Sequence, residues 1–193
     1  FFLEGITATA RMTACYRGGR VNARKVSACV TIDDAHMPDL RIHPLPGYTP
    51  AIGRLVAQLT YSREILLAAV AGLDVAGLDH VHDGASNSIG ALLAHIVAVE
   101  KWYQLFTFER RSPNAAEEAA WEAALELGDP GRMHLKGREL PSYVDELATT
   151  RSQTLAKLAQ RDDEWLEAPL PTTVAMNAHW AWFHVMEDEI NHR

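Results

Sequence analysis

In four separate stretches of the chain, apolar side chains recur at intervals of three and four residues. The stretches run from about Thr49 to Gly72, from about Asn87 to Glu109, from Pro141 to Arg161, and from about Asn177 to Arg193. Because this spacing places the apolar side chains on one face of an α-helix, each stretch is predicted to form an amphipathic helix. The alternation typical of strands is scarce, so the sequence predicts an all-α protein.

Residues near the ends of these stretches support the predicted boundaries. Pro50 suits the first turn of a helix, and Gly72 suits the residue after its last turn. The second helix has three competent caps, Ser86, Asn87 and Ser88. Ser142 and Asp145 have the spacing of a capping box at the start of the third. The sequence therefore places each helix start beside a residue that can satisfy its backbone.

A connection of about 30 residues separates the second and third predicted helices, longer than is common between helices of a bundle. A short helix is expected there from Ala115 to Leu127, followed by a loop through "DPGRMHLKGREL". The last predicted helix shows no C-cap glycine and no proline, so we expect it to be truncated at Arg193. Four amphipathic helices with one long connection predict a four-helix bundle.

The first 36 residues differ from the rest of the chain. They show no sustained helical or strand period and contain both cysteines, Cys15 and Cys29. Met37 opens a segment that reads like a natural start, so we expect residues 1–36 to be an upstream extension, disordered or non-native. The alternative is a genuine arm with a short strand at "KVSACVTI". Residues 37–193 are then predicted to form the domain.

Charge and cysteine usage limit the partners and the compartment. The formal net charge is −7, which argues against a nucleic-acid partner or an anionic membrane surface, since both require a basic face. No apolar run approaches the roughly 18 residues of a membrane span. The two cysteines form no CxxC motif and no dense framework, which favours a reduced, cytoplasmic protein.

The last predicted helix carries an unusual set of polar groups in "FHVMEDEINHR". His184, Asp188 and His192 are separated by four residues each, and every such step turns about 40° around a helix. They therefore form a slowly turning stripe on one face. Asp188 and His192 have the i, i+4 spacing of two ligands to one cation. The alternative is a solvated face with local ion pairs.

Three kinds of metal site fit parts of this helix. Glu189 and His192 form the E-x-x-H unit of di-iron bundles, but such a site needs a second E-x-x-H, and the sequence has none. D-E-x-x-H resembles a zincin motif with aspartate in place of the first histidine, which needs a further ligand beyond the motif. A mononuclear site with His95 of the second helix fits better. Taken alone, a histidine on an apolar face is more often a packed core residue.

"SNSIGALLAHIVAVEKWY" and "FHVMEDEINHR" resemble the second-helix and last-helix signatures of the DinB-like (YfiT-like) superfamily of bacterial proteins. The resemblance covers roughly residues 37–193. It implies a four-helix bundle, commonly a homodimer, with a divalent metal held by His95, Asp188 and His192. The family more often has histidine where this chain has Asp188. A carboxylate makes the site harder, which favours Zn, with Ni, Mn and Fe as alternatives.

The resemblance also implies a class of reaction. Relatives include thiol-dependent isomerases and S-transferases that use mycothiol or bacillithiol. It therefore implies a mononuclear metal enzyme of thiol-dependent transfer or hydrolase type, with a low-molecular-weight thiol as cosubstrate. The alternative is a non-catalytic helical dimer or binding module with a structural His/Asp cluster. No catalytic residue is assigned.

Three further residues near the candidate ligands could contribute to the site. His184 could line the pocket, and Glu189 could orient a ligand imidazole. Glu189 could instead pair with Arg193 one turn along the helix. Glu100 is expected to point away from the ligand direction and to serve as a cap or a surface pair, with a contact to the last helix behind the ligands as the alternative.

Overall fold

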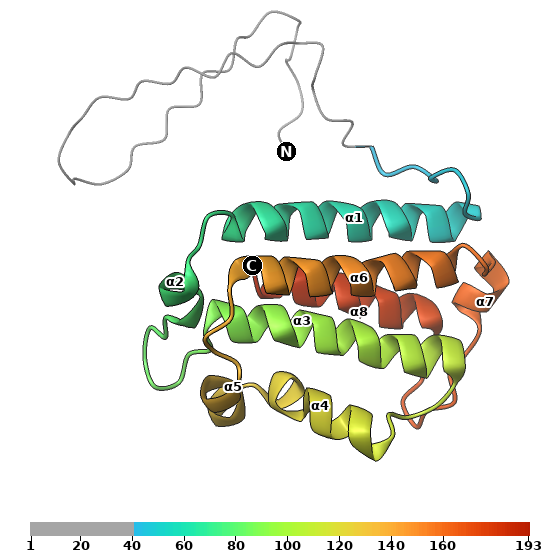
Figure 1. Cartoon of the computed structure of the whole chain (residues 1–193). Helices are drawn as coiled ribbons and strands as arrows, with labels where there is room; N and C mark the ends of the chain where they lie inside the picture. Colours follow the sequence, from blue (N-terminus) through green and yellow to red (C-terminus); the bar gives the residue numbers. More distant parts are fainter. Residues whose placement is uncertain (1–40) are drawn as a thin grey trace, which may run out of the picture. The chain divides into compact units, whose positions relative to one another are not determined.

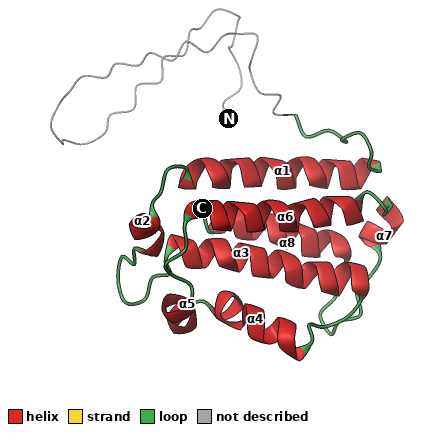
Figure 2. Ribbon diagram, viewed as in Figure 1, coloured by secondary structure: helices red, strands yellow, loops and turns green. Residues whose placement is uncertain are grey.

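The computed structural model describes residues 41–193, so the expected extension over residues 1–36 lies outside the described part of the chain (Figure 1). Within residues 41–193 the regular elements are helical, and one isolated β-bridge joins Pro169 to Asn177 (Figure 2). The prediction of an all-α protein is confirmed. None of the described helices is both long enough and apolar enough to cross a membrane.

The four long helices lie where the apolar periodicity predicts them, and shorter helices occupy the connections. In chain order the elements are α1 (Pro50–Val70), α2 (Val75–Asp79), α3 (Ile89–Tyr103), the π-helical continuation η2 (Gln104–Glu109), α4 (Ala115–Glu126), α5 (Gly128–His134), α6 (Leu140–Leu158), α7 (Asp163–Glu167) and α8 (Ala178–Asn191).

The long helices α1, α3, α6 and α8 run alongside one another (Figure 1). α3 packs against α6, α8 and α4, while α1 packs against α8 and α6. Buried apolar side chains fill the space between them, among them Leu59 and Trp182 in one cluster and Leu93 and Leu147 in another. This packing brings α3 and α8 into direct contact although the connection, α6 and α7 separate them in sequence.

Several local expectations are corrected. The segment expected as a loop contains α5. Asp129 lies in its first turn and Arg132 in its last turn, where their charges interact favourably with the helix dipole. The capping box expected at Ser142 is absent, because α6 already begins at Leu140 and has no side-chain cap. The last helix, expected to continue to Arg193, spans Ala178–Asn191, and its expected truncation stays a prediction.

A carboxylate from α7 caps the start of α1. Asp163 accepts hydrogen bonds from the hydroxyl of Thr49 and from the backbone N–H groups of Ala51 and Ile52, at 3.0 and 3.3 Å for the two N–H groups. These bonds, led by the one from Thr49, hold the pKa of Asp163 below its usual 3.8. The cap therefore ties the two helices together through an ionised group.

We expect Asp163→Asn to lower the melting temperature at neutral pH. Because the folded pKa is depressed, the ionised cap stabilises the fold above the unfolded pKa of about 3.9 and ceases to do so as pH falls through the lower folded value. The difference in melting temperature should therefore shrink below about pH 4. Calorimetry over this range tests it, with Asp145→Asn on the exposed face of α6 as control. A difference that stays constant down to low pH would contradict the electrostatic explanation.

Candidate metal centre

Two rows of side chains face each other where α3 and α8 meet. The rings of His95 and His192 lie 5.1 Å apart in an edge-to-face arrangement. Two turns further along α3, the ring of Tyr103 lies 5.9 Å from that of His184. Since the later residue on α3 meets the earlier residue on α8, the two helices are antiparallel here. His95 and Tyr103, eight residues apart on α3, therefore face His192 and His184, eight residues apart on α8.

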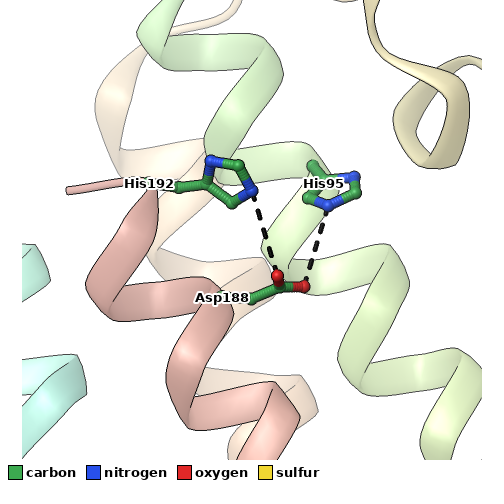
Figure 3. Close-up of side chains that lie close together, drawn as sticks. All are labelled: His95, Asp188 and His192. Atoms are coloured by element: carbon green, nitrogen blue, oxygen red, sulfur yellow. Dashed lines mark ion pairs between the residues drawn. The ribbon is translucent and has the colours of Figure 1, made fainter.

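His95, Asp188 and His192 point toward one another (Figure 3). Nε2 of His95 lies 3.7 Å from Oδ2 of Asp188, and Nε2 of His192 lies 3.9 Å from Oδ1. Each residue offers one donor atom, and the three atoms all lie within 4.8 Å of one another. The structure thus brings together the three side chains that the sequence marks as ligands, from two helices far apart in the chain.

The donor set fits a divalent ion. Two donor atoms that are each about 2.0–2.2 Å from one zinc ion are at most roughly 4.4 Å apart. The distances of 3.7 and 3.9 Å, which run to different oxygens of Asp188, lie within this limit, and because the three donor atoms are separated by up to 4.8 Å, they have to move slightly closer to share one ion. Two imidazole nitrogens and one carboxylate oxygen suit zinc and similar metals and leave a coordination position open. The His192 side chain keeps 26% of its surface exposed, so the cluster can be reached from solvent. The cluster could therefore hold a metal ion.

The orientation of His95 is set from α4. Its Nδ1 lies 2.8 Å from the backbone carbonyl oxygen of Ala124, which can only accept a hydrogen bond. Nδ1 therefore donates to this carbonyl, and Nε2, the nitrogen directed at Asp188, is the ring atom left to bind a metal. Metal-binding histidines are commonly held in this way by a carbonyl or carboxylate behind them.

His192 is in the protonation state that a metal requires. Burial lowers its pKa below the usual 6.5, and His95 lowers it further, while Asp188 only partly opposes both. The ring is therefore neutral at pH 7. A neutral imidazole can offer its lone pair without first losing a proton.

His184 lies beside the cluster of three. Its Nδ1 is 3.1 Å from the carboxylate of Glu187, and its ring stacks on Trp180 at 5.1 Å. The His184 ring thus lies between Trp180 of α8 and Tyr103 of α3.

Tyr103 was not singled out by the sequence. It is buried, and burial together with the negative charge of Asp188 raises its pKa to about 12. Its phenol therefore keeps its proton at neutral pH and remains a hydrogen-bond donor near the cluster. The sequence feature that could have identified Tyr103 is its spacing of eight residues from His95, which places both on one slowly turning stripe of α3.

Glu189 and Glu100 lie elsewhere than expected. Glu189 is fully buried, and its carboxylate accepts bonds from Ser62, Arg63 and Arg151 rather than from a ligand imidazole. Glu100 is also fully buried and accepts bonds from both arginines, so it is neither a cap nor a surface residue. Burial alone would raise the pKa of Glu100, but Arg151 and Arg63 outweigh it and the net shift is downward.

Arg63, Glu100, Arg151 and Glu189 form what we call the buried charge network. One residue comes from each of α1, α3, α6 and α8, and the two positive charges balance the two negative ones. The remaining donors of the arginines reach the carbonyl oxygens of Leu147 and Leu59. The sequence does contain a signal for this network, because each arginine interrupts the apolar face of its helix.

Comparison with known proteins adds one finding. The sequence model of a family described as Mycothiol-S-transferase matches residues 54–193. The match includes nearly all of α1 and every helix after it, and with them the three clustered side chains. Comparison with curated proteins gave no match.

Proposed function

The chain belongs to the mycothiol S-transferase family, and so to the DinB-like superfamily, and from this premise we propose that it is a metal-dependent enzyme that transfers a low-molecular-weight thiol to an electrophile. The observation that carries the proposal is the convergence of two imidazoles and a carboxylate at 3.7 and 3.9 Å. These are the donors that a single divalent ion needs, and two of them are half-buried. We propose zinc as the ion, because the donor set is of borderline hardness.

In the proposed mechanism, His95, Asp188 and His192 hold the ion. When bound, a divalent ion would lower the pKa of a coordinated thiol and favour its thiolate. The carbonyl of Ala124 keeps Nε2 of His95 directed at the site. The protonated phenol of Tyr103 remains available as a hydrogen-bond donor. The overall reaction forms a bond between the thiol sulfur and an electrophilic carbon, the bond from that carbon to its leaving group breaks, the leaving group departs as an anion (chloride for monochlorobimane), and the thiol proton is released to solvent.

We further propose a cytoplasmic homodimer. A thiol cosubstrate requires a reducing compartment, in agreement with the cysteine pattern of the sequence. Trp180, Phe183 and Ile190 on α8 are each more than 40% exposed, an unusual density of large apolar groups on one helix of a protein surface. Such a surface is suited to a second copy of the chain.

A thiol-consumption assay tests the activity. Zinc-loaded protein is mixed with mycothiol and monochlorobimane, and thioether formation is followed by fluorescence, with bacillithiol and glutathione as comparison thiols. Because a Lewis-acid ion contributes several kcal/mol, chelation should lower the rate at least about 100-fold, and zinc should restore it. A rate that is unchanged by chelation, or no thioether above background with any of the three thiols, would contradict the proposal.

A further inference from the structure

The last turn of α8 is held in the protein by carboxylates rather than by apolar side chains. Ala181, Trp182 and Val185 are fully buried, but after Val185 the buried side chains of the helix are Asp188 and Glu189. Met186 is partly buried and packs against the core, and Ile190, the next large apolar residue after it, is 43% exposed. The turn that carries two of the three clustered donors therefore lacks a buried apolar anchor of its own.

The two carboxylates connect this turn to different helices. Asp188 and Glu189 are adjacent, so their side chains leave α8 about 100° apart. Asp188 is directed at His95 of α3. Glu189 is directed at α1, where Oε2 accepts from the hydroxyl of Ser62 at 2.8 Å and Oε1 accepts from Nε of Arg63 at 3.0 Å. Rotation of the turn about the helix axis would break the bonds of Glu189 and move Asp188 away from His95.

We propose that Glu189 is the positioning residue of the metal site: through Ser62 and Arg63 it fixes the rotation of the last turn of α8, so that Asp188 and His192 face His95. This inference rests on the proposed function, since it assigns a role to Glu189 at that same site. Arg63 is itself held, because another of its nitrogens donates to the carbonyl of Leu147 on α6 at 2.8 Å. The position of Asp188 and His192 is thus fixed by contacts with α1 and α6, two helices that carry none of the three donors.

Two charge-balanced double variants separate positioning from stability. Arg63→Met with Glu189→Leu removes the bonds between Glu189 and α1. It leaves Arg151 paired with Glu100, with Nε of Arg151 2.8 Å from Oε1 of Glu100. Arg151→Met with Glu100→Leu removes the other pair and the 2.6 Å bond from Arg151 to Glu189, but leaves the bonds from Arg63 and Ser62 to Glu189 in place. Replacing a balanced buried ion pair with apolar side chains is often neutral or stabilising, so both variants are expected to fold.

The readouts are the zinc dissociation constant, from competition with a chelating dye, and the visible absorption of the cobalt-loaded protein, which reports ligand geometry. The Arg63→Met, Glu189→Leu variant should bind zinc about 10- to 100-fold more weakly, the usual effect of removing a group that orients metal ligands. Its cobalt absorption bands should also differ from those of the wild type. The variant that lacks Arg151 and Glu100 should stay much closer to the wild-type constant and spectrum, because Glu189 keeps its bonds from Ser62 and Arg63 and loses only the one from Arg151. Thermal melting confirms that each protein is folded at the assay temperature.

Equal zinc affinity and identical cobalt spectra for the two double variants would overturn the positioning role and leave the metal site itself intact. If the wild-type protein binds neither zinc nor cobalt, the proposed function falls, and this inference falls with it. If the Arg63→Met, Glu189→Leu variant does not fold, Ser62→Ala tests the positioning role instead, because it removes only one bond of Glu189. It should weaken zinc binding to a smaller extent, and unchanged affinity would overturn the proposal.

Discussion

His95→Ala and His192→Ala are each expected to abolish stoichiometric zinc binding. Structural zinc sites bind with roughly 10–16 kcal/mol shared among their ligands, so one ligand of three or four accounts for about 3–4 kcal/mol. Its loss lowers affinity by about 10²- to 10³-fold. Because the two histidines come from different helices, parallel losses would show that one ion is shared across the α3–α8 contact. Elemental analysis of purified, dialysed protein measures this directly.

His184→Ala is the matched control for these variants. His184 lies on α8 one turn before Asp188 and contacts Glu187 and Trp180, outside the three clustered donors. Its removal should leave the metal content unchanged. Full metal retention in both the His95 and His192 variants would defeat the ligand assignment. A thermal stability that chelation does not affect would then favour a non-catalytic protein with a structural His/Asp cluster.

Arg151→Met is expected to destabilise the fold by about 3–5 kcal/mol. Its guanidinium donates to Glu100 at 2.8 Å and to Glu189 at 2.6 Å, and it also reaches the carbonyl of Leu59. Without it, two fully buried carboxylates share the single charge of Arg63, and the low-dielectric interior leaves one of them uncompensated. Chemical denaturation followed by circular dichroism measures the loss.

Arg111→Met provides the comparison on the surface. Arg111 pairs with Glu109 and Glu117 in a solvent-exposed position, where ion pairs contribute little to stability. It should therefore denature close to wild type. Adding Glu100→Leu to Arg151→Met should recover much of the lost stability, since charge balance is restored. If Arg151→Met denatured like Arg111→Met, the charge balance of the buried network would not matter to the fold.

The long helices and the candidate ligands could be predicted because both depend on local spacing. The apolar period that defines α3 places His95 on the buried face, and the four-residue spacing of Asp188 and His192 is a property of one helix. His95 was proposed as the third donor from its place on the apolar face of the second helix, and the resemblance to known proteins implies the same residue, although no local pattern states which helix faces meet. Short elements such as α5 were missed, because seven residues that include glycine and proline carry too weak a period.

The buried charge network could not be predicted for a different reason. Glu100 and Glu189, viewed within their own helices, are indistinguishable from surface carboxylates, and burying either one alone would be costly. Their burial becomes possible only when Arg63 and Arg151 approach from α1 and α6. Such compensation is a property of the assembled helices, so it appears only with the tertiary structure. The two arginines within apolar stripes are the one trace that it leaves in the sequence.

The bond between His95 and Ala124 has a consequence for how this site can vary. The acceptor is a main-chain oxygen in the last turn of α4, where carbonyl groups have no partner within the helix and the helix dipole is negative. The identity of the side chain at this position is therefore irrelevant to the imidazole, whereas the length of the helix is not. Deleting or inserting one residue in α4 would turn that carbonyl by about 100° and leave the ring without its acceptor. The bond that orients His95 thus depends on the length of α4 and not on the chemical identity of a side chain.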